Sequence, residues 1–343
     1  MQYKIDEFMK KHYKLTILIM AVLLVGLIVI SFVLGRYPIS VREFWGIVGS
    51  KIFRIEPFWT ASQESLLLYG RLPRVIMACL VGCALSAAGA SYQGVFQNPM
   101  AAPDLLGASN GAAFGAALAI LLNLGNTSVM ILSFAFGLIT VLIVVIIGNN
   151  IRGKRTLGFI LAGIMVSSLA SSGVSFIKIV ADPSDELPAI TYWLMGSLNG
   201  IMPEDLLFAA VPMIIGLIVL FLMRWRINIL TLGDEQARTI GVNTRILRML
   251  IIAAATLVTS VCVATSGVIG WIGLVIPHMA RKAVGDDYKK LLPASMLMGA
   301  IFLLIADDIS RCLFVNEIPI GILTSIIGAP FFIYLIVRGG NRS

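Results

Sequence analysis

Charged residues are scarce in this chain. Asp, Glu, Lys and Arg make up 13% of its 343 residues, whereas 58% are hydrophobic, and the mean hydropathy is +0.94. A soluble domain carries a charge on about a quarter of its residues. The composition therefore excludes a soluble globular protein and indicates an all-helical, polytopic membrane protein.

Residue types that bind metals or catalyse reactions are also few. The four cysteines show no C-x-x-C spacing, and Cys79 and Cys83, which share a helix face, suit small apolar packing positions better than a metal pair. His278 is the only histidine inside an apolar run, and a single imidazole makes a poor metal site. We expect it to pack or cap near the inner surface. No paired catalytic residues appear in the apolar runs, so we expect neither a metal site nor an enzyme.

Ionisable residues are almost absent from the middle of the apolar runs. A carrier driven by a proton or sodium gradient normally needs such a relay, which disfavours the alternative of a secondary transporter of a small organic or metal-complex solute. Asp307 and Asp308 are the exceptions. They precede Arg311 at helical spacing, which favours a structural ion pair at the outer boundary.

A nucleotide-binding motif is lacking as well. Residues 148–154 read GNNIRGK and match the start of a phosphate loop, but Arg155 occupies the Ser/Thr position and the segment joins two apolar runs. The chain therefore has no ATPase of its own and binds no cofactor that the sequence reveals. Its energy must come from a gradient or from a partner.

What the sequence does contain is a series of apolar runs. Residues 249–280 form a run of 32 uncharged residues, about 48 Å as one helix and too long for one crossing of a hydrocarbon core of about 30 Å. Basic residues flank both its ends, so the chain must go out and return, with a break at Gly267, Gly270 and Gly273. We predict about ten spans, at 15–34, 72–96, 105–122, 128–148, 157–180, 206–223, 249–265, 267–280, 291–310 and 318–337.

The distribution of basic residues orients these spans. With both termini inside, 18 of the 26 Lys and Arg residues lie on the inner side. The net charge of +8 is thus an orientation signal and not a nucleic-acid patch. Two sets of five spans must run in opposite senses, as in an inverted repeat. No linker or low-complexity tract appears, so we expect one membrane domain over residues 1–343.

Small and polar residues recur within particular spans. Pro99 and Pro103 break the helix between the second and third spans, and Gly107, Gly111 and Gly115 predict a close-packing ridge. Other small residues share faces of the fifth and tenth spans. These faces could line a pathway, or the serines could bond back to their own helices; the residues are Ser168, Ser172, Ser175, Gly321, Ser325 and Gly328.

Several motifs carry a family resemblance: RLPR, QGVFQNPMAAPDLLG, GDEQARTIGV, GLVIPHMAR and EIPIGILTSIIGAPFF. Over residues 65–338 the chain resembles the FecCD-type permeases of iron-siderophore, haem and cobalamin ABC importers, the membrane subunits of type II importers. The resemblance implies a permease in a bacterial or archaeal cytoplasmic (inner) membrane. Its implied partners are two ATP-binding cassette subunits that use ATP and Mg, a second permease copy or sister permease, and an extracytoplasmic binding protein.

The resemblance also assigns roles to residues. The inner segment 230–248 could be an ordinary loop by its polarity alone, but it is similar to the coupling helix that docks on the ATPase. The matching positions are Gly233, Asp234, Glu235, Ala237, Arg238, Gly241 and Val242.

Two further sites come from the same resemblance. At the outer side, Arg71 and Arg311, with Arg74 beside them, would meet carboxylates of the binding protein, although arginines at this depth can also reach lipid head groups. At the inner side, the gate would comprise Asn98, Met100, Thr156 and Leu157. Met100 stands where the family usually has Leu, and Leu157 replaces a polar residue, which suggests a narrower and drier gate.

Overall fold

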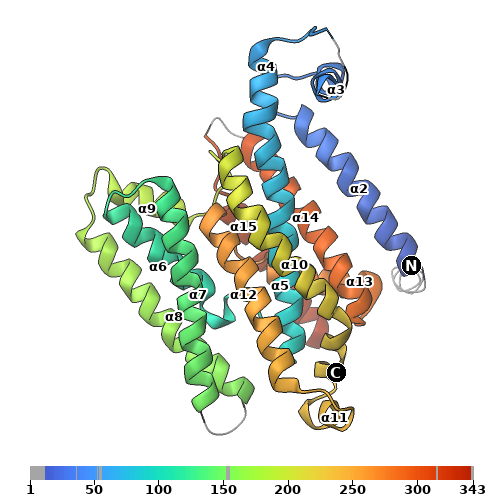
Figure 1. Ribbon diagram of the computed structural model, residues 1–343, viewed down its shortest axis with the longest axis vertical. Coiled ribbons are helices and arrows are strands. Elements are labelled where there is room, and N and C mark those ends of the chain that lie inside the picture. The colour runs from blue at the N-terminus through green and yellow to red at the C-terminus, as the bar shows by residue number, and fades with distance from the viewer. Residues whose placement is uncertain are drawn as a thin grey trace.

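The computed structural model of the chain is a bundle of long helices (Figure 1). The structure describes residues 12–35, 37–51, 53, 56–151, 155–313 and 316–340, and all regular elements in these ranges are helical. In chain order they are α2 (Tyr13–Val33), α3 (Val41–Ser50), α4 (Ala61–Ser65), the π-helix η1 (Leu66–Arg71), α5 (Leu72–Val95), the 3₁₀ turn η2 (Pro103–Leu106), α6 (Ala108–Leu121), α7 (Asn126–Asn150), α8 (Arg155–Val180), α9 (Glu186–Leu194), α10 (Pro203–Thr231), α11 (Asp234–Thr239), α12 (Thr244–Ser266), α13 (Ile272–Val284), α14 (Tyr288–Cys312) and α15 (Ile320–Gly340).

The helices fit a polytopic membrane protein. Within the described ranges, seven helices are long and apolar enough to cross a membrane, and α6 and part of α15 are shorter apolar helices. Each predicted span coincides with one helix. However, α13 has 13 residues, about 20 Å at 1.5 Å per residue, so the prediction that it crosses fully is not supported by its length.

Helix α5 lies at the centre of the bundle. Its packing against α14 is the most extensive in the molecule, and it also contacts α10, α12 and α13. A Cβ atom at Gly82 would collide with the backbone of Gly299 on α14, and one at Gly89 with the backbone of Gly273 on α13. The small residues of α5 therefore allow direct backbone contact between helices.

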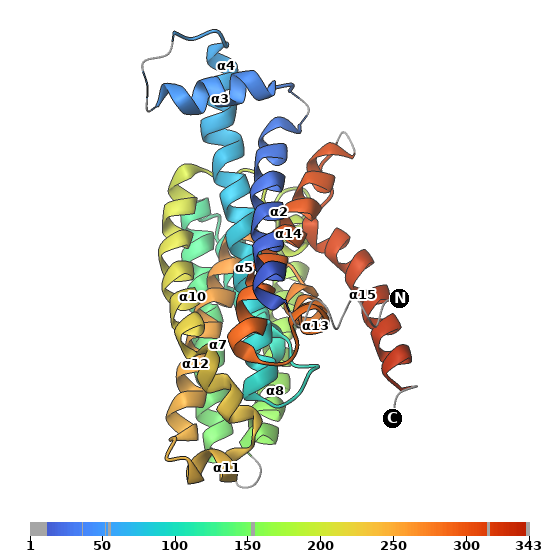
Figure 2. The same ribbon diagram turned by 90° about the vertical axis from the view of Figure 1, so that its right-hand side faces the viewer.

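The segment between the first two predicted spans contains helical structure. Helix α5 extends outward through η1 and α4, so that one continuous helix runs from Ala61 to Val95. Pro73 lacks an N–H group, and its ring crowds the preceding turn. The wider π turn of η1 lies just before it and accommodates this defect. Figure 2 shows α3 lying across the outer end of this helix.

The glycine ridge predicted on α6 is shorter than expected. Gly111 and Gly115 pack against α7, where added Cβ atoms would meet Thr140 and the carbonyl oxygens of Phe136 and Leu132. Gly107, in contrast, precedes the helix with φ +77°, a left-handed conformation that glycine adopts without strain. It ends η2 and starts α6, so it belongs to the turn and not to the ridge.

The break within 249–280 occurs where α12 ends. Gly267 has φ +65° and caps α12, and Trp271 also has a positive φ, so the chain reverses over residues 267–271. Gly273 was predicted to belong to this break but lies inside α13, where its missing side chain makes room for Pro103. The predicted break is thus present but shorter than predicted, and the course out of and back into the membrane stays a prediction.

Substitution at Gly111 tests the packing of α6 on α7. We expect Gly111→Leu to lower the free energy of unfolding by about 1–3 kcal/mol or more, because the new side chain overlaps Thr140 and backbone atoms. It should be more damaging than Leu118→Gly, which leaves only a cavity. Gly26→Leu is the matched control, since nothing lies within 4 Å of a Cβ at Gly26. Thermal unfolding in detergent is the measurement, and equal losses for Gly111→Leu and Gly26→Leu would contradict the packing.

Candidate functional site

The turn that follows α5 is fixed by a small set of hydrogen bonds. The side-chain oxygen of Asn98 accepts a bond from the backbone N–H of Met100 at 2.9 Å. His278 on α13 bonds the carbonyl oxygen of Pro99 at 2.8 Å, as expected for a loop-packing histidine. Gln97, with φ +51°, donates to the carbonyl oxygen of Leu230 at 2.5 Å. This inner turn, residues 97–100, is thereby tied to both α13 and the end of α10.

The structure describes the side chains of three of the four predicted gate residues. Met100 and Leu157 are exposed in the isolated chain, at 48% and 55% of their surface, so both are available to face a pathway or a second subunit. Asn98 is half-buried and braces the turn through its bond to Met100. The side chain of Thr156 lies outside the described residues. The gate assignment of these four residues stays a prediction.

A polar network behind the inner turn was not predicted. Arg281 on α13 donates to the side-chain oxygen of Gln93 at 2.6 Å and to the hydroxyl of Tyr288 at 3.1 Å. Gln93 in turn approaches the carbonyl oxygens of Gly273 and Leu274 at 3.5 and 3.4 Å. The network joins α5, α13 and α14 near their inner ends. Its partners are far apart in sequence, so no local motif signals it.

The coupling segment forms a short helix, α11, at the inner end of the bundle (Figure 1). Positive φ values at Gly233 and Gly241, +102° and +80°, bracket it. Asp234 forms an ion pair of 2.7 Å with the buried Arg248 of α12, and Ala237 is fully buried. These two residues hold α11 to the bundle, and Glu235 is left exposed.

Of the remaining coupling residues, Val242 is partly buried against the main apolar core, so it helps to anchor the segment. The side chain of Arg238 is not among those described. Exposed apolar side chains surround α11, and these are Leu232, Ile240, Ile246 and Leu250. An exposed apolar patch of this kind suits a protein contact.

The serine face of α8 is exposed and satisfied within its own helix. The hydroxyls of Ser172 and Ser175 donate to the carbonyl oxygens of Ser168 and Ser171 at 2.9 and 3.0 Å. Back-bonding of this type satisfies a serine in an apolar setting. The predicted face therefore exists and is open in the isolated chain, and its role as a pathway lining stays a prediction.

Two of the three small residues on the predicted face of α15 pack closely against other parts of the chain. A Cβ at Gly321 would meet the carbonyl oxygen of Met195, and one at Gly328 would meet the ring of Trp271. Ser325 is exposed and bonds back to the carbonyl oxygen of Gly321 at 2.7 Å. The two glycines thus serve close packing in the isolated chain, and only Ser325 is open.

The three outer arginines are buried, with exposed fractions of 5, 9 and 7% for Arg71, Arg74 and Arg311. Arg71 donates to the carbonyl oxygens of Phe32, at the end of α2, and Tyr37, and Arg311 donates to that of Ser31 at 2.5 Å. Two guanidinium groups thus lie at the negative end of the α2 dipole and cap its last carbonyls.

Arg74 forms the centre of an ion-pair cluster. Its Nε lies 2.9 Å from a carboxylate oxygen of the fully buried Asp307, and its Nη1 lies 3.0 Å from Glu317. Asp308 pairs with Arg311, as predicted from their spacing, and Asp307 lies 3.9 Å from the same guanidinium. All three arginines are buried and bond within the chain, which weighs against direct contact with a docked protein. Their docking role stays a prediction.

Metal ligands do not converge anywhere in the described ranges: no group of three or more His, Cys, Asp or Glu side chains there could hold a metal ion.

Comparison with known proteins identifies the family of the chain. A family model described as the FecCD transport family matches residues 22–338. The chain belongs to this family. FecCD proteins are permease subunits of ABC importers, so the chain is a transport subunit and not an enzyme, and it spans the membrane several times.

Individual relatives cover nearly all of the chain. It is 37% identical over 340 residues to the molybdate import system permease protein MolB of Haemophilus influenzae, covering 98% of each. It is 42% identical to an iron chelatin transport system permease of Helicobacter pylori, covering 81% of this chain and 84% of the relative. A solved inward-facing ABC transporter of metal-chelate type matches with a TM-score of 0.85 and 36% identity, covering 94% of this FecCD chain and 99% of that one.

The buried cluster at the outer boundary predicts a large stability effect. We expect Arg74→Ala to lower the free energy of unfolding by about 3–5 kcal/mol, because the buried Asp307 loses its closest partner and keeps only the longer contact with Arg311. The double variant Arg74→Leu with Asp307→Leu should recover most of the loss. Lys51→Ala, which breaks the exposed pair with Glu64 at 2.7 Å, is the control and should have little effect. Thermal unfolding in detergent measures all three, and a loss for Arg74→Ala no larger than the control would refute the assignment.

Proposed function

We propose that the chain is a ten-span permease of a bacterial or archaeal cytoplasmic membrane, with both termini inside, that imports a metal chelate. The observation that carries the proposal is the near full-length similarity to metal-compound permeases, together with the structural match to a metal-chelate type transporter. One membrane domain over the whole chain fits this function.

The course of the helices supports the proposed topology. In both views α2 runs upward, toward the end that carries α3 and α4, whereas α10 runs downward to α11 (Figures 1 and 2). The sets that begin with these helices would thus run in opposite senses, as an inverted repeat requires. Because α11 lies at the end flanked by the basic clusters, that end is assigned to the cytoplasm.

The inner geometry suggests how an ATPase would act on the permease. In the proposal, an ATP-binding cassette subunit docks on the exposed surface of α11, which includes Glu235 and the nearby apolar side chains. Helix α11 follows α10 directly, and the end of α10 is bonded to Gln97 in the inner turn. Movement of α11 would therefore be transmitted to the end of α10, and from there through Gln97 to Met100 in the same turn. Two such subunits, using ATP and Mg, would serve a pair of permeases.

The outer end would receive an extracytoplasmic binding protein. There α3 and α4 project beyond the other helices (Figure 2). In this region Trp59 and Lys51 both donate to Glu64, at 3.0 and 2.7 Å. We propose that the outer arginines position this surface, because Arg71 and Arg311 bond the last carbonyl oxygens of α2.

Two cargo classes fit the relatives. Iron chelates are favoured by the Helicobacter pylori permease, which has the higher identity. Molybdate is favoured by the Haemophilus influenzae permease, which matches over the whole length. We place the iron chelate first and keep molybdate as the second candidate.

Charge reversal on α11 tests the coupling assignment. We expect Glu235→Arg to weaken binding of the cognate ATPase by about tenfold, because the side chain is exposed and free of the contacts that hold α11 in place. Glu204→Arg, an exposed reversal in the first turn of α10 at the outer end, should leave binding unchanged. Co-purification and binding assays in detergent measure the effect. Equal ATPase binding by both variants would remove the assignment.

Uptake into proteoliposomes tests the cargo and the energy source. With the cognate ATPase and binding protein, we expect ATP-dependent uptake of an iron chelate and no uptake driven by an ion gradient alone. The matched measurement uses molybdate under the same conditions. Uptake of molybdate alone would replace the cargo assignment, and gradient-driven uptake without ATP would contradict the proposed mechanism.

A further inference from the structure

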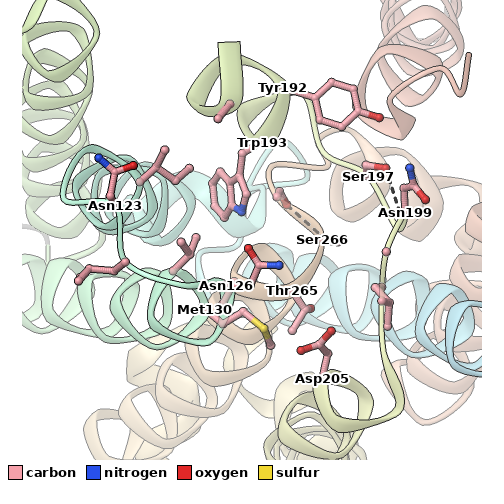
Figure 3. Close-up of a pocket in the computed structure, with 18 residues that line it drawn as sticks. Asn123, Asn126, Met130, Tyr192, Trp193, Ser197, Asn199, Asp205, Thr265 and Ser266 are labelled. Carbon is pink, nitrogen blue, oxygen red and sulfur yellow. Dashed lines mark hydrogen bonds between the residues drawn. The ribbon is translucent and has the colours of Figure 1, made fainter. Parts of the chain in front are cut away.

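A cavity with both polar and apolar lining residues lies at the outer end of the molecule, away from the sites discussed above (Figure 3). Its volume is about 490 Å³, within the range of small-molecule sites. The turn between α6 and α7, helix α9, the start of α10 and the end of α12 form its walls. The resemblance assigned none of its residues.

Asp205 supplies the only charge among the 18 lining residues. One of its carboxylate oxygens accepts the backbone N–H of Met202 at 2.9 Å, as the cap of α10. The other oxygen has no hydrogen-bond or ion-pair partner in the described part of the chain. Asp205 is half-buried, so it presents an unpaired negative charge to the cavity.

Aromatic rings and amides complete the lining. Trp193 packs partly against α6 and α7, and its indole projects into the cavity with Tyr192 nearby (Figure 3). The indole N–H and the side-chain amides of Asn126 and Asn199 have no partners among the described residues. Aromatic faces attract cations, and the amide oxygens accept hydrogen bonds.

This lining excludes two classes of ligand. A bare divalent ion needs several carboxylate or carbonyl ligands, and the cavity offers one carboxylate. An anion would meet Asp205 without any Lys, Arg or His in the lining. The adjoining outer segment adds further negative charge, from Asp182, Asp185, Glu186 and Glu204.

We propose that this cavity binds a small organic cation with an ammonium or guanidinium group, held by Asp205, the face of Trp193 and the amides of Asn126 and Asn199. Such a ligand would link α7, α9, α10 and the segment that follows α9. That segment is already bonded to the end of α12 through Ser197 and Ser266 at 2.8 Å. Binding would therefore stabilise the folded protein.

The experiment measures ligand-dependent thermal unfolding and calorimetric binding of the full chain in nanodiscs made of phosphatidylglycerol, which lacks an amine. The soluble probes are L-arginine, ethanolamine and choline, with glycerol and acetate as neutral and anionic comparisons. We expect a saturable rise in the melting temperature with at least one cation and none with glycerol or acetate. A second arm replaces part of the lipid with phosphatidylethanolamine, so that a lipid head group as the source of the cation is distinguished from a free one.

Two matched variants assign the effect to the cavity. Asp205→Asn keeps an oxygen for the cap of α10 but removes the charge, and it should weaken cation binding by about tenfold or more. Glu204→Gln removes the neighbouring charge, which does not line the cavity, and should leave binding unchanged. Stabilisation by a soluble cation or by the amine lipid, lost in Asp205→Asn only, supports the site. No response to any cation, an equal response to glycerol, or an undiminished response in Asp205→Asn overturns it.

Discussion

Two glycine pairs bring the backbone of α5 into direct contact with its neighbours, Gly82 with Gly299 of α14 and Gly89 with Gly273 of α13. In a bilayer there is little hydrophobic drive between helices, so close van der Waals packing must hold the bundle together. Any side chain at these positions would force the helices apart. The inner turn, the outer ion pairs and the close approach of Pro103 to Gly273 all depend on this separation.

Polar groups are concentrated near the two ends of the central helices. Near the outer end, Arg74 pairs with Asp307, and Arg71 and Arg311 cap α2. Near the inner end, Arg281 bonds Gln93. A buried charge is tolerated only with a partner, so each cluster fixes the relative height of the helices that it joins. Between these clusters the buried side chains of the described residues are uncharged, although some are polar, such as Tyr92, whose hydroxyl bonds that of Thr256 at 2.9 Å.

The apolar runs alone predict the helices, because the cost of exposing backbone groups to lipid leaves few other structures. Local spacing also predicts the pair of Asp308 and Arg311. The partners of Arg74 could not be predicted, since Asp307 and Glu317 lie more than 200 residues away along the chain. The outward extension of α5 was missed because Gly70 and Pro73 are ordinary signs of a helix end, and a π turn overrides them here. The positive φ of Gly107 was hidden by its regular spacing with Gly111.

The continuous helix from Ala61 to Val95 has a mechanical consequence. Its 35 residues span about 50 Å, so the α3–α4 region outside and the inner turn at Gln97 are two ends of one stiff rod. Because Gly82 and Gly89 bring α5 into backbone contact with α14 and α13, the inner half of the rod is clamped between these helices. The wider turn at η1 lies outside this clamped half, so a load on the outer arm would bend the rod at η1 and leave the inner tip in place.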